Sequence, residues 1–438
     1  MRINEVIFLF FFCSSFNLYA VDNLSIKVEE ITTNKGFKFL FVEDNNLPKV
    51  SLNILFKNAG YAYEKKQCLS WFTSLIIKEG AGENGAEEFA KILEDKGIRL
   101  HFDSSKEYFG VSLDTLSENL EEGISLLSDA IMRPIIDDEG LKRVYNMVKV
   151  ELNYLEKDSY YTAKQGLKKL LFKEHPYSNS KYGTLSAVEN ITRNDVVRYI
   201  KDNFAKDNIV ISTVGSTRKE ELIKLLDKYL YKLPSKRSKV KKIPIKNDFG
   251  PPENKHIFMD IPQSVILFGQ KGIVYSDPNY YNASVLVNAL GGMGLNSILM
   301  RELRHNLGIT YGIRAYIDAD KHGSYITGSM NTDSSTSRQS ISAIKEVFSK
   351  VKEEGVDEQL FKDTKVSMVN SFIFSLFNSG NIITQLDHIQ LNDFGHDYIN
   401  NYVNYIENVK LDKVNELASS LLDHKNLFFV EVGGGTQK

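Results

Sequence analysis

The order of predicted elements occurs twice along the chain, and this duplication limits the possible folds more than any other feature. Each half opens with two strands rich in Val, Ile and Phe and continues with helix. A second strand pair and two long helices of 3.6-residue periodicity follow. The stretches are 37–60, 86–97, 99–116 and 117–155 in the first half, and 255–273, 280–306, 309–332 and 337–372 in the second. We therefore expect the α+β class, with two similar α/β-sandwich domains whose antiparallel-rich sheets are covered by helices.

The stretch KLPSKRSKVKKIPIKNDFGPPENK separates the halves. It is basic, contains four prolines and lacks periodicity, which is typical of an exposed linker. The sequence thus predicts an N-terminal domain over 21–232, a linker over 233–253 and a C-terminal domain over 254–438. The 438 residues are enough for two such domains, each with its own core.

The first twenty residues, MRINEVIFLFFFCSSFNLYA, have the pattern of a secretory signal peptide. Arg2 precedes an apolar run from Val6 to Phe12, and the small residue Ala20 stands at the expected cleavage point. The run is too short to cross a bilayer, which takes about 20 apolar residues. We expect residues 1–20 to be removed and the mature protein to be secreted or periplasmic, with Cys68 as its one cysteine.

The charge balance excludes a nucleic-acid-binding role. Lys and Arg number 54 against 56 for Asp and Glu, which gives a net charge of -2. Proteins that bind nucleic acid usually carry a strong basic excess. The chain therefore carries no electrostatic indication of a nucleic-acid partner.

Two segments, GLKRVYNMVKVELN and MRELRHNLGITYG, together with the duplicated halves, resemble the pitrilysin/insulinase-type zinc metallopeptidases, or inverzincins. The resemblance extends from about residue 24 to 433. It is to the small bacterial members with two domains and to the non-catalytic, alpha type of mitochondrial processing peptidase subunit. Active members hold zinc with H-x-x-E-H on a helix, whose glutamate activates the metal-bound water, and with a later glutamate.

The zinc motif is degenerate in this chain. The resemblance aligns H-x-x-E-H with CLSWFTSLI, where Trp71 replaces the first histidine, Ser74 the glutamate and Leu75 the second histidine. The later glutamate corresponds to Glu151. A catalytic zinc site needs three protein ligands, so one carboxylate cannot hold the metal. We expect no catalytic residue, no metal and no cofactor in this chain.

The second half retains a pair that the family uses to hold substrate. Arg304 and Tyr311 stand seven residues apart in LRHNLGITYG, the first at a predicted helix end and the second at a strand start. A guanidinium and a phenol can stabilise negative charge that develops on a carbonyl oxygen. The resemblance implies that this chain is the substrate-binding subunit of a heterodimeric peptidase. Its partner would be a homologous subunit that carries H-x-x-E-H and the zinc, and the substrate an unfolded peptide.

Two alternatives remain open from the sequence. The chain could be a stand-alone peptide-binding or scaffold protein without a peptidase partner. It could also be a peptidase with an unorthodox metal site near His388 and His396 in LDHIQLNDFGHDY, where the possible ligands are densest. The glycine-containing segment GGMGLNS, just before the helix of Arg304, could line a substrate chamber or simply break a helix.

Overall fold

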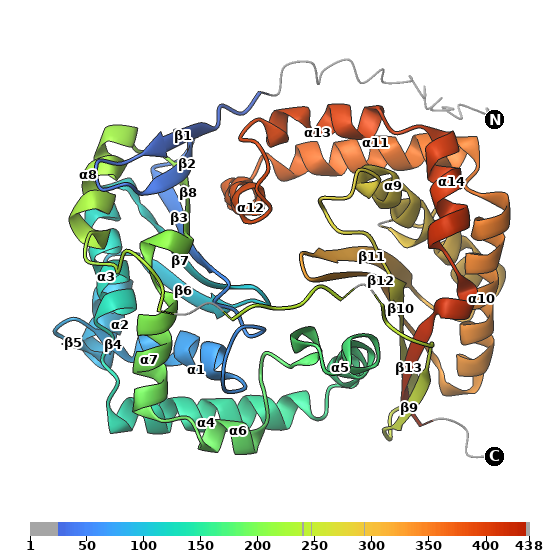
Figure 1. Cartoon of the computed structure of the whole chain (residues 1–438), viewed down its shortest axis with the longest axis horizontal. Coiled ribbons are helices and arrows are strands. Elements are labelled where there is room, and N and C mark those ends of the chain that lie inside the picture. The colour runs from blue at the N-terminus through green and yellow to red at the C-terminus, as the bar shows by residue number, and fades with distance from the viewer. Residues whose placement is uncertain (1–24, 239–240, 247, 293, 435–438) are drawn as a thin grey trace, which may run out of the picture.

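The computed structural model describes residues 25–238, 241–246, 248–292 and 294–434. Two helix-covered sheets lie at opposite sides of the molecule, one from each half of the sequence (Figure 1). The predicted class, two α/β domains of similar fold, is confirmed. The predicted signal peptide lies outside the described residues.

The sheet of the first half contains six strands in the order β1-β2-β8-β3-β7-β6. Within this sheet, as far as the structure describes it, β2 and β8 run parallel and the other pairs are antiparallel. The strands are β1 (Glu29–Thr32), β2 (Lys38–Glu43), β3 (Lys49–Lys57), β6 (Arg99–Ser104), β7 (Tyr108–Leu116) and β8 (Ile209–Gly215); β4 (Gly80–Ala81) and β5 (Asn84–Gly85) form a separate small ribbon.

The sheet of the second half repeats this topology with five strands in the order β11-β12-β10-β13-β9. Its pair β13 and β9 is parallel, as β8 and β2 are, and β10 lies between β13 and β12 as β3 lies between β8 and β7. The strands are β9 (Asn254–Phe258), β10 (Gln263–Lys271), β11 (Ile313–Asp320), β12 (Gly323–Asp333) and β13 (Phe428–Gly433). The duplication predicted from the sequence is thus a duplication of strand order.

Helices cover both sheets. The first half contains α1 (Leu69–Ile76), α2 (Ala86–Asp95), α3 (Leu120–Met132), α4 (Asp138–Leu155), α5 (Ser159–Phe172), α6 (Leu185–Glu189), α7 (Arg193–Asn203) and α8 (Lys219–Leu230). The second half contains α9 (Tyr280–Gly291), the π-helical η5 (Met300–Asn306), α10 (Ser337–Glu354), α11 (Glu358–Ser375), α12 (Ser379–Leu391), α13 (Tyr398–Glu407) and α14 (Leu411–Leu421). None of the described helices is by itself long and apolar enough to cross a bilayer; α11 and α12 would qualify only as a pair, bent by 110°.

The two halves also correspond in two consecutive helices, whose N-terminal caps lie at the same separation along the chain. The Asp137 side chain caps the N-terminus of α4 by accepting a hydrogen bond from the backbone N–H three residues later. Asp357 caps α11 in the same way. Asp158 then caps α5, and Asn378 caps α12 at the same separation along the chain. An oxygen-bearing side chain at this position satisfies a free N–H of the first helical turn. The four caps show that α4 and α5 correspond to α11 and α12.

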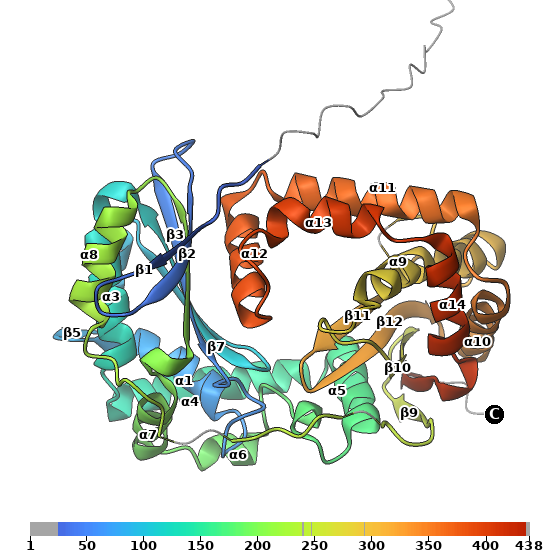
Figure 2. The same ribbon diagram turned by 45° about the horizontal axis from the view of Figure 1, so that its top comes forward.

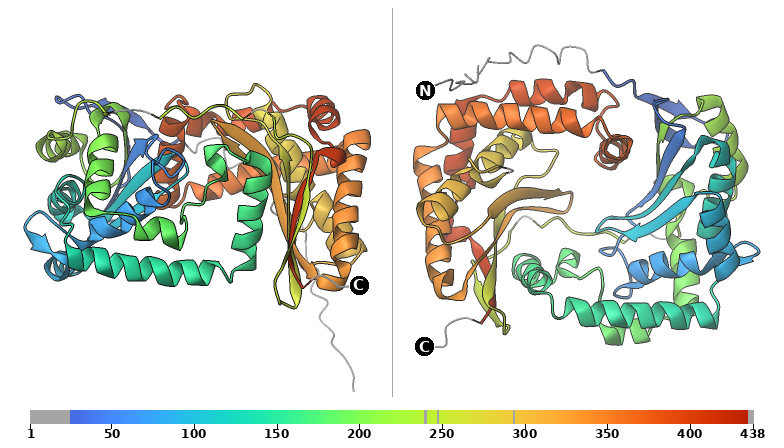
Figure 3. Two further views of the ribbon diagram at one scale, coloured as in Figure 1. Left: turned by 60° about the horizontal axis from the view of Figure 1, so that its bottom comes forward. Right: turned by 180° about the vertical axis from the view of Figure 1, so that it is seen from behind.

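The two halves exchange one helix each across the centre of the molecule. Helix α5 belongs to the first half of the sequence but packs on β10 and β13 of the second sheet. Conversely, α12 of the second half packs on β8 and β3 of the first sheet (Figures 1 and 2). Leu167 and Leu171 of α5 join the core formed by Val265 and Leu267 of β10. Each sheet therefore has one face covered by its own helices and the other covered by a helix of the opposite half (Figure 3).

The linker is less exposed than its composition indicates. Lys236, Lys241 and Lys242 are exposed, but Ile243 and Phe249 are buried in the core between α5 and the second sheet. Lys241 also donates to the carbonyl of Ala62 at 3.1 Å. The prediction of an exposed connector is wrong for these two apolar side chains, because they cover apolar surface where the halves meet.

Candidate functional site

The helix that aligns with the zinc motif begins at an unusual cap. Cys68, at the N-cap position, has a left-handed backbone with φ 58°. The buried carboxylate of Glu64 accepts from the N–H of Cys68 at 2.6 Å and from the N–H and hydroxyl of Ser70 at 2.9 and 2.7 Å. Burial raises the pKa of Glu64 to about 8 despite these donors. Glu64 thus fixes the start of α1 by satisfying its first N–H groups.

Apolar packing fills the stretch that the resemblance aligns with the zinc ligands. The side chain of Trp71 is buried and meets the ring of Tyr182 edge-on, with 4.8 Å between ring centroids. Ser74 is buried and donates its hydroxyl to the Trp71 carbonyl at 2.7 Å, and Leu75 packs against the same core. Glu151 lies near Tyr182 on the half-buried side of α4, and burial together with its charge raises the pKa of that phenol. Zinc binds nitrogen, sulfur and carboxylate ligands, so these residues do not fit the metal.

The unorthodox metal site near His388 and His396 is not supported. The described part of the chain contains no group of three or more His, Cys, Asp or Glu side chains placed to hold a metal ion. His388 packs against the rings of Tyr275 and Phe394, and burial lowers its pKa to about 4. His396 is exposed to solvent. The density of possible ligands in this stretch therefore reflects a helix end and the turn after it.

The segment that carries Arg304 and Tyr311 is a helix end followed by a strand. Gly308 has φ +65° and ends η5, as expected for a glycine just past a helix. The N–H of Ile309 then bonds to the Leu303 carbonyl at 3.0 Å. Thr310 donates its hydroxyl to the Asn331 carbonyl at 2.7 Å, which fixes the turn before β11. Tyr311 stands just before this strand and is 85% exposed.

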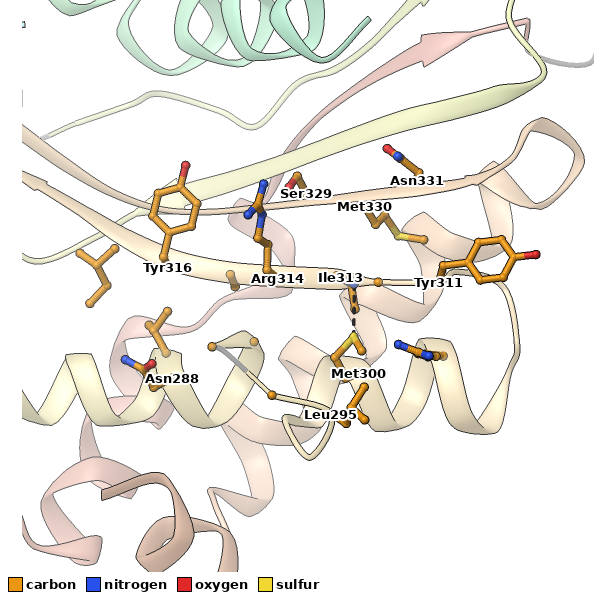
Figure 4. A pocket seen from close by; sticks show the side chains of 18 of the residues that line it. Asn288, Leu295, Met300, Tyr311, Ile313, Arg314, Tyr316, Ser329, Met330 and Asn331 are labelled. Carbon is orange, nitrogen blue, oxygen red and sulfur yellow. Dashed lines mark hydrogen bonds between the residues drawn. The ribbon is translucent and has the colours of Figure 1, made fainter. Parts of the chain in front are cut away.

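Arg304 and Tyr311 line one cavity of about 860 Å³. Its walls are α9, the glycine segment, η5, β11 and β12 (Figure 4). Tyr160 of α5 also lines it. Figure 4 shows Tyr311 at one end of the cavity, Tyr316 at the other and Arg314 between them. The cavity follows β11, which is the last strand of its sheet and pairs with β12 alone among the described strands. An edge strand thus forms the centre of the site, and the N–H of its Ile313 donates to the Met300 sulfur at 3.3 Å (Figure 4).

The cavity is electropositive. It is lined by Arg304 and Arg314, and none of the described lining residues is acidic. Burial raises the pKa of Tyr316 to about 12, so its phenol stays protonated and can donate a hydrogen bond. The nearest carboxylate along β11, that of Asp318, pairs with Lys106 of the first half at 3.4 Å. The arrangement can therefore bind carbonyl oxygens or an anionic group.

Arg314 and Tyr160 are among the lining residues that the sequence did not reveal. Arg314 lies on the same face of β11 as Tyr316, and the alternation in ITYGIRAYI contains that information. Tyr160 comes from α5 of the other half, and the local sequence gives no indication that this helix crosses between the halves. The glycines of the GGMGLNS segment that the structure describes, Gly291, Gly292 and Gly294, do line the cavity.

These features define a protein of two similar helix-covered halves, with mainly apolar packing in the stretch that the resemblance aligns with a zinc motif. Residues 190–368 match the family described as the peptidase M16 inactive domain. The chain is 26% identical to the "Non-peptidase homolog YmxG" of Helicobacter pylori over 334 residues, which are 76% of this chain and 77% of the relative. A probable mitochondrial-processing peptidase subunit beta of Schizosaccharomyces pombe is 24% identical over 60% of this chain and 58% of its own.

Solved structures share the whole fold. The peptidase M16 inactive domain from Pseudomonas fluorescens superposes with a TM-score of 0.87 at 22% identity, over 93% of this chain and 98% of that one. A protease from Helicobacter pylori gives a TM-score of 0.85 at 15% identity, over 93% of this chain and all of that one. The chain is thus similar to proteins described as a peptidase M16 inactive domain and as a non-peptidase homologue. The more specific likeness to the alpha type of processing peptidase subunit stays a prediction.

Proposed function

We propose that this protein is the substrate-binding subunit of a heterodimeric zinc peptidase. The partner would be a homologous chain that carries H-x-x-E-H and the zinc, and this chain would supply Arg304 and Tyr311 to the partner's active site. One observation carries the proposal: both side chains line a single open cavity, while the position of the zinc motif is packed with apolar groups. A subunit that holds substrate needs Arg304 and Tyr311 in an open cavity, but it does not need zinc ligands of its own.

The position of β11 as the last strand of its sheet offers a way to hold an unfolded peptide. An extended peptide can add to an exposed sheet edge through main-chain hydrogen bonds, which tolerate many sequences. Arg304 and Tyr311 would then donate to a substrate carbonyl at the end of that strand. Donors placed where charge develops stabilise the transition state more than the bound substrate, so they accelerate the reaction.

We also propose that the protein is exported and that its mature form begins near Val21. The support is the charged start, the apolar run and the small residue Ala20 in the first twenty residues. N-terminal sequencing of the protein purified from its native source is the measurement. A mature protein that still contains residues 1–20 would contradict export by cleavage.

The role in trans is tested by turnover of the reconstituted pair. Arg304→Ala or Tyr311→Phe should leave folding and assembly intact, since both side chains are exposed, and should lower peptide turnover by about 10²–10³ per lost donor. Arg304→Lys should also impair turnover, because an ammonium cannot form the planar fork of a guanidinium. Gel filtration verifies that the two chains remain associated.

Matched controls are available on the same chain. Arg338→Ala, on the exposed first turn of α10, and Tyr231→Phe, just after α8, remove the same groups away from the cavity and should leave turnover unchanged. Unchanged turnover in the Arg304→Ala, Tyr311→Phe double variant would reject the role in trans. Failure to associate with any H-x-x-E-H homologue, together with peptide binding by this chain alone, would favour the stand-alone peptide-binding protein.

A further inference from the structure

The cavity contains a second guanidinium that the Arg304–Tyr311 pair does not explain. Arg314 is exposed on β11, and its side chain lies on the face opposite to the buried residues Ile313 and Ala315. Ser329 is its direct neighbour on β12, and Asn331 follows two residues later on the same face. Figure 4 shows the Arg314 guanidinium beside Ser329 and between Tyr316 and Asn331. Arg314 is therefore surrounded by side chains that can donate hydrogen bonds.

Among the described residues, no carboxylate pairs with this guanidinium. Within the ranges that the structure describes, neither Arg314 nor Arg304 forms an ion pair. Asp318 lies further along the same face of β11, but Lys106 of the first half already pairs with it and with Asp320. An uncompensated guanidinium among neutral donors attracts an anion from outside the protein.

We propose that Arg314, Tyr316, Ser329 and Asn331 form a subsite for a carboxylate, so that the peptides this protein holds carry an Asp or Glu side chain there. The inference rests on the proposed peptide-holding function and adds the class of peptide. Successive side chains of a strand added to β11 alternate between the two faces of the sheet. One set would lie on the side of Arg304, and the other would lie against Arg314.

The residue types suit a carboxylate better than a neutral acceptor. A guanidinium can donate two parallel hydrogen bonds to the two oxygens of a carboxylate, and these are stronger than bonds between neutral groups. The Ser329 hydroxyl, the Asn331 amide and the protonated Tyr316 phenol can donate to the remaining lone pairs. A lysine side chain at the same place would meet like charge and would be excluded.

The test is peptide binding by the full chain on its own, without the peptidase partner. Three fluorescein-labelled ten-residue peptides alternate Val with Glu, with Gln or with Lys, and fluorescence anisotropy gives the three dissociation constants. The Val–Glu peptide should bind about tenfold more tightly than its isosteric Val–Gln twin, the gain expected for charge-assisted hydrogen bonds. Added salt should reduce this preference, and the Val–Lys peptide should bind most weakly.

Variants identify the residue responsible. Arg314→Gln should bring the Glu and Gln peptides to within about twofold of each other, whereas Arg338→Gln, the same change of charge outside the cavity, should keep the preference. Equal binding of the two peptides by the native chain, or a preference that survives Arg314→Gln, would overturn the carboxylate subsite while peptide holding stands. Binding of none of the three peptides would overturn both the subsite and the peptide-holding function on which it rests.

Discussion

At the scale of single residues, the same helical spacing serves two different sites. Side chains three and four positions apart share one face of a helix. In a metallopeptidase this spacing brings two histidines to one metal ion, and in this chain it brings Trp71 and Leu75 to one apolar core. The absence of zinc-binding side chains at Trp71 and Leu75 can be predicted from the sequence alone, because it depends only on residue types. The contact between Trp71 and Tyr182 could not be predicted, because Tyr182 lies in a distant loop.

Trp71 should therefore contribute to stability, and we predict the size of this contribution to the free energy of unfolding. Trp71→Ala leaves a cavity against Tyr182 and should lower the free energy of unfolding by about 3–5 kcal/mol. Tyr154→Ala, which removes an aromatic side chain that is 67% exposed, should change it by less than about 0.5 kcal/mol. Urea denaturation monitored by circular dichroism measures both. Equal effects of the two substitutions would show that Trp71 is not a core residue.

At the scale of helices and strands, hydrophobic patterns predicted most elements but not the partners that cover them. The run FLFV in β2 has alternate side chains in two different cores, Phe39 and Phe41 in one, Leu40 and Val42 in the other. A continuous apolar run indicates a strand buried on both faces. It cannot indicate that α12, more than 300 residues later, covers the second face. The pattern of the duplicated stretches does not include β8 and β13, which correspond to each other in the two sheets.

The contact of α12 with the first sheet contains a buried carboxyl group that titrates abnormally. Asp387 accepts from the Asn53 amide and the Ser212 hydroxyl, each at 2.6 Å, and burial raises its pKa to about 6. An unfolded aspartate has a pKa of about 3.9. Between these two values the folded chain retains a proton that the unfolded chain releases, so the free energy of unfolding falls as the pH rises from about 4 to about 6.

Asp387→Asn should remove this pH dependence. The stability of the variant relative to the native chain should rise by up to about 3 kcal/mol between pH 4 and pH 7, as measured by urea denaturation across that range. His388, whose pKa is lowered to about 4, acts in the opposite direction but is present in both proteins. Asp393→Asn, two residues beyond the end of α12, controls for the change in net charge. A stability difference that stays constant with pH would contradict the assignment.

At the scale of the whole molecule, the exchange of α5 and α12 makes the two halves depend on each other. Alone, the first half would present Leu40, Val42 and Val214 without the helix that covers them, and its own α5 would expose Leu167. Apolar surfaces of this kind cause association or loss of fixed packing in isolated fragments. The sequence predicted two domains of similar fold, but periodicity carries no information about which half buries a given helix.

Expression of the halves as separate chains tests this dependence. Residues 25–232 and 241–434 should each fold poorly alone, with strong binding of an anilinonaphthalene sulfonate dye and no cooperative urea transition. Together they should form a stable one-to-one complex, because each supplies the helix that completes the other's core. The second fragment includes Ile243 and Phe249, so that the anchored part of the linker stays with its core. Fragments that each unfold cooperatively on their own would show that the exchanged helices are not needed for folding, and the two halves would then be independent domains.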